Sequence, residues 1–200
     1  LIYFAMQNDN LKSYLHLHVI VFIWGFTAIL GKLISLEALD LVWYRMLFAS
    51  VIMTFVVLFN KEKMKVPFNV LVGFIVSGII IAAHWLTFYQ AIKVSNVSIT
   101  LACLSTGAFF ASILEPIFYK RKVIWYELLF GVIVVVGLGI IFNVETKYKT
   151  GIYLAVTSAF LSALFSVING KYAKEYNPNI ISLYELSSGV FFISIYLFFA

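Results

Sequence analysis

Seven long apolar runs fill most of this 200-residue sequence and constrain its fold more than any other feature. A helix needs roughly 20 apolar residues to cross the hydrocarbon core of a bilayer. The runs have about that length and lie near residues 15–34, 41–59, 68–91, 97–118, 123–143, 151–170 and 180–200. The sequence therefore predicts an all-α protein, a polytopic bundle of transmembrane helices.

Composition excludes the soluble classes of protein. Hydrophobic residues make up 63% of the sequence and charged residues 12%, and the mean hydropathy is +1.01. That leaves too little polar surface to cover a soluble globule of this size. No segments alternate between polar and apolar residues as barrel strands do, so we expect the backbone hydrogen bonds to form inside helices.

Two parts of the sequence are similar to each other. Residues 15–59 align with residues 154–198 without a gap, which matches Gly31-Lys32 with Gly170-Lys171. The second copy begins five spans after the first. An odd number of spans puts the two copies in opposite orientations across the membrane, as in many transporters. The sequence thus predicts an inverted repeat.

Basic residues predict the orientation, because lysine and arginine concentrate in cytoplasmic loops. With a cytoplasmic N-terminus, nine of them fall on the inner side: Lys12, Lys61, Lys63, Lys65, Lys120, Arg121, Lys122, Lys171 and Lys174. Four fall on the outer side: Lys32, Lys93, Lys147 and Lys149. We therefore place the N-terminus in the cytoplasm. The net charge of +5 then indicates topology and contact with anionic lipid headgroups rather than nucleic-acid binding.

Arg45 is the residue within a span that most needs an explanation. An ionised side chain in hydrocarbon costs roughly 3 kcal/mol or more, and it usually faces a bundle interior or a water-filled cavity. Arg45 lies about one turn below the outer interface, beside Trp43 and Tyr44. Two interpretations stay open: Arg45 faces a substrate pathway, or it extends to the interface and pairs with Asp40 or Glu37.

The predicted substrate pathway contains, besides Arg45, five aromatic or polar residues: Trp24, His84, Tyr89, Gln90 and Tyr184. His84 lies in the same outer half of the membrane as Arg45, and its titration would couple transport to protons. Trp24 fits helix packing as well as a substrate wall. Tyr184 is the repeat equivalent of Arg45.

Three glutamates map to the inner side of the bundle: Glu115, Glu127 and Glu185. They lie close in sequence or depth to the basic stretch Lys120-Arg121-Lys122, which predicts an inner charge network. Glu115 and Glu185 are a candidate inner gate, with ordinary anchoring at the interface as the alternative. Helix rise places Glu115 too far from the level of Arg45 for the two to pair. Glu115-Pro116 also predicts a bend or an end of the fourth helix.

The sequence carries no motif for catalysis, for a cofactor or for a metal. His16 and His18 point apart on a helix and cannot share a metal ion. The motifs H-E-x-x-H and G-x-S-x-G are missing. Cys103 is the single cysteine, so neither an internal disulfide nor a cysteine metal site can form. We expect no enzyme activity, no cofactor and no metal site.

Short phrases in several spans are distinctive. They are Phe22-Ile23-Trp24-Gly25-Phe26, Trp43-Tyr44-Arg45-Met46-Leu47-Phe48-Ala49, Thr87-Phe88-Tyr89-Gln90-Ala91-Ile92 followed by residues 95–102, and Gly131 with Gly137-Leu138-Gly139. Together they resemble the EamA family of the drug/metabolite transporter superfamily, over nearly all of the chain from about residue 15. One departure is Lys120-Arg121-Lys122, where many members carry a Gly-Glu pair. Another is Tyr184, where the first repeat has an arginine.

The resemblance implies a ten-helix carrier with two inverted five-helix repeats around a central cavity. In that layout residues 1–14 are an N-terminal cytoplasmic segment, residues 15–143 are the complete first repeat, and residues 151–200 are the first two helices of a truncated second repeat. The start at Leu1 and the end at Ala200, inside an apolar run, lead us to expect a piece of a longer protein.

We therefore expect a transporter that moves a small organic metabolite or drug-like solute by alternating access in the cytoplasmic (plasma) membrane of a bacterial-type cell. Its expected partners are the lipid bilayer, the small-molecule substrate, a coupling proton and a second copy in a homodimer, with no nucleic acid. A non-transporting membrane scaffold or subunit stays open as the alternative, and an intramembrane enzyme is less favoured.

Overall fold

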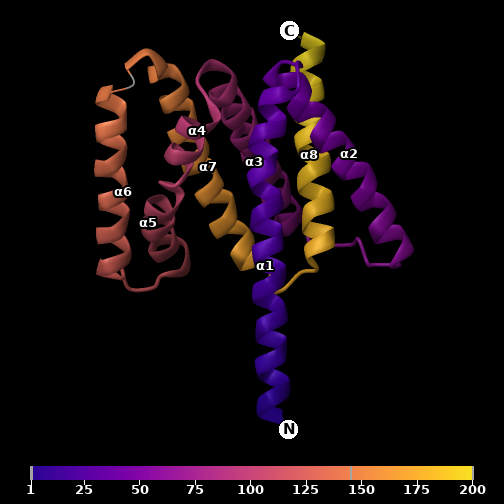
Figure 1. Cartoon of the computed structure of the whole chain (residues 1–200). Coiled ribbons are helices and arrows are strands. Elements are labelled where there is room, and N and C mark those ends of the chain that lie inside the picture. The colour runs from indigo at the N-terminus through magenta and orange to yellow at the C-terminus, as the bar shows by residue number, and fades with distance from the viewer. Residues whose placement is uncertain (1, 145, 200) are drawn as a thin grey trace.

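The computed structural model of the protein describes the backbone of residues 2–144 and 146–199 and the side chains of residues 11–140 and 147–199. Within those residues every element is a helix, and Figure 1 shows the long helices side by side. The elements are α1 (Ile2–Leu33), α2 (Ala38–Phe59), α3 (Phe68–Val94), α4 (Val97–Leu104), α5 (Gly107–Tyr119), α6 (Trp125–Val144), the short 3₁₀ turn η1 (Thr146–Tyr148), α7 (Lys149–Tyr172) and α8 (Pro178–Phe199).

Six segments of the described chain are long and apolar enough to cross a membrane: Leu11–Leu33, Ala38–Phe59, Phe68–Val94, Val97–Tyr119, Lys149–Tyr172 and Pro178–Phe199. Each overlaps a predicted span. The remaining predicted span, residues 123–143, corresponds to α6, whose apolar part Trp125–Ile140 is shorter. The protein is an integral membrane protein, and the predicted class of a polytopic helical bundle is confirmed.

The helices α7 and α8 run opposite to α1 and α2 (Figure 1). In that view α1 rises and α2 descends, whereas α7 descends and α8 rises. The predicted inverted repeat requires this relation between the two aligned segments. The symmetry between them stays a prediction.

The turns at one end of the bundle collect most of the basic residues. Segments 60–67, 120–124 and 173–177 all lie at the lower end in Figure 1. In or beside these turns are eight of the residues assigned to the inner side: Lys61, Lys63, Lys65, Lys120, Arg121, Lys122, Lys171 and Lys174. The fold therefore keeps the predicted basic cluster together at one end.

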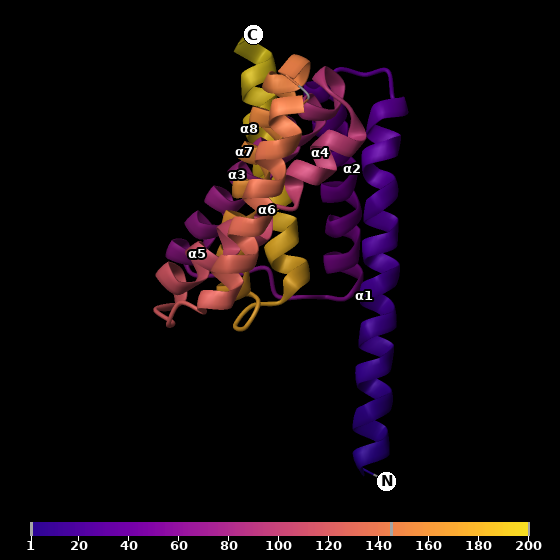
Figure 2. The same ribbon diagram turned by 60° about the vertical axis from the view of Figure 1, so that its left-hand side comes forward.

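Helix α1 begins well before the predicted span, because the helix is continuous from Ile2 to Leu33. Its lower part projects away from the other helices in Figure 2, and its upper part packs on α3 and α4. Two lysines fix that upper contact: Lys32 Nζ donates to the Ile92 carbonyl oxygen at 3.2 Å, and Lys93 Nζ donates to the Ile34 carbonyl oxygen at 3.0 Å. Each ammonium thus satisfies a carbonyl near the end of the other helix.

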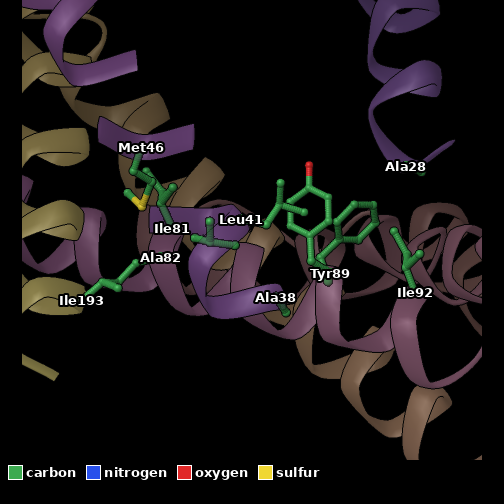
Figure 3. Packing of buried hydrophobic residues seen from close by; sticks show 11 residues of the cluster. Ala28, Ala38, Leu41, Met46, Ile81, Ala82, Tyr89, Ile92 and Ile193 are labelled. Atoms are coloured by element: carbon green, nitrogen blue, oxygen red, sulfur yellow. The ribbon is translucent and has the colours of Figure 1, made fainter. Parts of the chain in front are cut away.

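Helix α3 is the centre of the bundle and packs on α7, α8 and α2. Its contacts with α7 and α8 depend on two glycines. A Cβ at Gly73 would overlap the hydroxyl of Tyr172, and one at Gly78 would overlap the Ser188 hydroxyl and the Glu185 carbonyl. Small residues allow such close approach between helices in a membrane, where packing rather than burial from water drives association. Figure 3 shows part of the core that α3 shares with α1, α2 and α8.

The predicted fourth span is broken, but not at its proline. The helix passes through Pro116 to Tyr119 and instead breaks at Ser105 and Thr106, between α4 and α5. At the break the Ser105 hydroxyl donates to the Ala102 carbonyl oxygen at 2.6 Å, and the Thr106 hydroxyl donates to the Cys103 carbonyl oxygen at 2.7 Å. Backbone N–H groups of Ser105 and Thr106 bond the same carbonyls, and these donors together make the break tolerable in hydrocarbon. The helix ends at Tyr119, three residues after Pro116, so the expected helix end lies close to this proline, and the bend at Glu115-Pro116 stays a prediction.

Replacing Gly78 by alanine should destabilise the fold, because the added methyl group meets the backbone of α8. We expect a loss of roughly 1–3 kcal/mol, typical of overpacking. Gly137→Ala is the matched control, since nothing lies within 4 Å of a Cβ there and alanine favours the helix. Cys103, which is buried, reports unfolding through its reaction with a thiol-reactive fluorophore during heating. Equal melting temperatures for the two variants would contradict the close contact.

Candidate functional site

Arg45 lies against two aromatic side chains of α3. Its Nη1 donates a hydrogen bond to the Tyr89 hydroxyl oxygen. Its Cζ is 4.7 Å from the centroid of the Trp85 ring and 5.3 Å from that of the Tyr89 ring. A guanidinium over aromatic faces gains about 0.5–2 kcal/mol, more as water is removed. We call Arg45, Trp85 and Tyr89 the arginine cluster.

The packing of α1, α2 and α3 places this cluster. Tyr89 is 1% exposed and belongs to the core shown in Figure 3. Its ring fits because residue 31 is glycine: a Cβ there would lie 2.6 Å from Tyr89 Cδ1. Trp85 comes four residues earlier and thus lies one turn away on the same face of α3.

The arginine cluster contains no carboxylate. Among the described residues, the salt bridges are those of Arg121, so Arg45 pairs with neither Asp40 nor Glu37. The alternative in which Arg45 extends to the interface to reach an acidic partner is therefore not what the structure shows. The positive charge of Arg45 is held by a hydroxyl and two rings alone.

His84 faces a different helix. Its Nδ1 lies 2.9 Å from the Ser158 carbonyl oxygen and 2.8 Å from the Ser158 hydroxyl oxygen on α7. The Ser158 hydroxyl also donates to the His84 carbonyl oxygen at 3.1 Å. Because successive residues of a helix turn by 100°, positions 84 and 85 point to different neighbours. His84 links α3 to α7 and does not join the arginine cluster.

The other predicted pathway residues are dispersed. Trp24 is 69% exposed on α1. Tyr184 lies toward the opposite end of the bundle, where its hydroxyl donates to the Met64 carbonyl oxygen at 2.9 Å. Gln90 lines a cavity of about 500 Å³ between α2, α3, α7 and α8, whose wall is otherwise apolar except for Thr87 and Tyr196. Of the six residues, only Arg45 and Tyr89 meet.

Two of the three glutamates predicted for the inner side form a charge cluster with Arg121. Arg121 Nη2 lies 2.9 Å from Glu115 Oε2 and 2.9 Å from Glu127 Oε2. The hydrogen bonds with Glu127 and then Glu115 hold the pKa of Arg121 above its usual value. The three side chains line a cavity of about 400 Å³ between α5 and α6, together with Ser112 and apolar residues.

Glu185 does not belong to this cluster. It is buried on α8, and Asn169 Nδ2 on α7 donates to its Oε2 at 3.1 Å. The predicted gate of Glu115 with Glu185 is thus divided between two places in the bundle. The sequence places both at the inner level, but only the rotation of each helix decides which neighbour its side chain meets.

Comparison with known protein families shows which family the chain belongs to. A model of the EamA-like transporter family matches residues 11–143, well over half of the chain. The chain belongs to the EamA family. No curated protein and no solved structure matches it.

Membership of the EamA family makes the chain a membrane transporter-like protein of the drug/metabolite transporter type. The family is one of transporters, which implies that its members are not enzymes. Within the part of the chain that the structure describes, no three His, Cys, Asp or Glu side chains come together as a metal site would need.

Sequence reasoning missed three partners of the predicted residues in this EamA protein. The sequence contained a signal for Trp85, because it stands four positions before Tyr89 and so lies on the same face of the helix. The sequence contained a signal for Asn169 as well, because a side-chain amide within an apolar span needs a hydrogen-bond partner. Ser158 had none: serine is common in membrane helices and can bond its own backbone.

Replacing Ser158 by alanine should cost about 1 kcal/mol, because the His84 ring and the His84 carbonyl both lose a hydroxyl partner. Ser166→Ala on the same helix is the control, since Ser166 is exposed. Thermal unfolding read through Cys103 measures both. A Ser158→Ala variant as stable as the control would show that the α3–α7 link contributes nothing.

Proposed function

We propose that this EamA protein is a secondary transporter that moves a small organic solute across the cytoplasmic membrane by alternating access. The arginine cluster carries the proposal. Arg45 stands within a membrane-spanning helix without a carboxylate partner, so its charge remains free to attract an anionic group. A guanidinium suits carboxylates and phosphates because its planar donors match their oxygens. The proposed solute therefore carries such a group.

The apolar cavity supports an amphipathic solute. Its volume of about 500 Å³ suits a small organic molecule, and its apolar wall with Thr87 and Gln90 resembles the usual ligand site of few polar groups on a hydrophobic surface. Gln90 follows Tyr89 on α3, so the cavity and the arginine cluster occupy the same level of that helix. We propose that the charge cluster of Arg121, Glu115 and Glu127, at the other end of the bundle, acts as an inner gate.

Arg45→Ala should weaken solute binding about 10-fold to 100-fold and lower the flux at low solute concentration accordingly, since a charged hydrogen bond to the solute is worth roughly 1.5–3 kcal/mol. Arg45→Lys should recover little because an ammonium lacks the planar donors. The measurement starts with a metabolite screen of cells that lack the protein and cells that overexpress it. A solute whose level differs between the two kinds of cell is then used to measure flux in each variant. Lys63→Ala, at an exposed position, is the control.

A membrane scaffold or subunit predicts a different result. In that case no solute would differ between the two kinds of cell, and Arg45→Ala would change only assembly or stability. Unchanged flux in Arg45→Ala, with the protein present at normal levels, would remove Arg45 from the proposed pathway.

We also propose that the basic end of the bundle and the N-terminus face the cytoplasm. In a Cys103→Ala background, Lys63→Cys should be labelled by a membrane-impermeant thiol reagent only after the cells are opened, and Leu36→Cys in intact cells. Both positions are exposed, in turns at opposite ends of the bundle. The reverse labelling pattern would invert the proposed topology. The homodimer stays a prediction.

A further inference from the structure

Glu185 is the one carboxylate that is buried among the described residues, with 4% of its surface exposed. It lies in α8, a membrane-spanning helix that packs on α3, and its side chain reaches Asn169 of α7. An ionised carboxylate in such a place costs several kcal/mol unless a cation or several donors satisfy it. Its surroundings therefore decide its protonation state.

Glu185 and its partner Asn169 each have one buried oxygen without a hydrogen bond. Asn169 Nδ2 donates to Glu185 Oε2 at 3.1 Å. Glu185 Oε1 and Asn169 Oδ1 are both buried, and neither has a hydrogen-bond partner. The two unsatisfied oxygens thus belong to the two groups that already share one hydrogen bond. Both are acceptors, so the pair lacks one donor.

One proton supplies that donor. Bound to Glu185 Oε1, it neutralises the carboxylate and lets the resulting O–H donate to Asn169 Oδ1. The carboxylic acid and the amide then form a cyclic pair with two hydrogen bonds, and no buried polar atom of either group is left unsatisfied. We propose that Glu185 and Asn169 form a proton-binding site between α7 and α8, and that it holds its proton in this conformation.

Among the described residues, no salt bridge supplies a cation in place of the proton. Several titratable residues of the helices around Glu185 have another environment, among them Arg45 on α2, His84 on α3, Lys171 and Tyr172 on α7, and Tyr184 on α8 itself. Arg45 lies on Trp85, and His84 bonds Ser158. Lys171 is exposed, Tyr172 packs on Phe74, and Tyr184 bonds Met64. Among the described residues, Glu185 has no salt bridge.

The site gives the transporter a means of coupling, and only this step depends on the proposed function. A movement that separates α7 from α8 would break the cyclic pair, hydrate Glu185 and release the proton. In this proposal Glu185 is the coupling group, and the coupling role of His84, whose Nδ1 is bonded to Ser158, stays a prediction.

Infrared difference spectroscopy tests the site directly and needs no substrate. The protein in lipid nanodiscs is titrated from neutral to alkaline pH, and the carbonyl stretching band of a protonated carboxyl group is followed. We expect the wild type to show this band at neutral pH and to lose it as the pH rises. Glu185→Gln, whose amide can form the same cyclic pair, should fold and lack the band. Glu175→Gln, which changes an exposed glutamate, should keep it.

A second variant makes the assignment independent of Glu185→Gln. Asn169→Ala removes the donor to the acid carbonyl, so the band should move to higher wavenumber. Absence of the band from the wild type at neutral pH, or its survival in Glu185→Gln, would overturn the proposal. Loss of the band when sodium replaces potassium would show a sodium site and overturn it as well. None of these results depends on whether the protein transports a solute.

Discussion

Close contact between α3 and the two helices α7 and α8 is the interaction on which the rest of the bundle depends. In a bilayer, apolar side chains gain little by leaving lipid for protein, so helices associate through shape and through hydrogen bonds. Gly73 and Gly78 supply the shape, since each admits an atom of the neighbouring helix where a Cβ would stand. The hydrogen bond between His84 of α3 and Ser158 of α7 lies in one of these close contacts.

Polar links of this kind explain why the predicted pathway residues dispersed. A buried polar side chain in a membrane helix is stabilised by a hydrogen-bond partner, either on its own helix or on a neighbouring one. His84 meets Ser158, Glu185 meets Asn169, and Trp43 Nε1 donates to the Ser194 hydroxyl at 2.8 Å. A polar residue in a span therefore marks a helix contact as readily as a substrate pathway.

The sequence predicts the helices well and their rotations poorly. Apolar runs determine where the spans lie, because the membrane core imposes one length on all of them. They do not tell which way a side chain points within a span that is apolar on all sides. Arg45 and Tyr89 could thus be named, but their contact needed the glycine at position 31 and the packing of α1. The break at Ser105 escaped prediction because the hydroxyl groups of Ser105 and Thr106 weaken a helix less visibly than Pro116 does.

The hydrogen bonds divide the central helices into two pairs. Helices α2 and α8 are joined by Trp43 with Ser194 and by Ser50 with Ser187 at 2.8 Å, whereas α3 and α7 are joined by His84 with Ser158. The contacts of Arg45 and Glu185 cross from one pair to the other: Arg45 on α2 bonds Tyr89 on α3, and Glu185 on α8 bonds Asn169 on α7. If one movement opens both of these contacts during the proposed transport, it frees the arginine and exposes the carboxyl group. Binding of an anionic solute and release of a proton would then be two consequences of one motion, which is the physical requirement for coupling them.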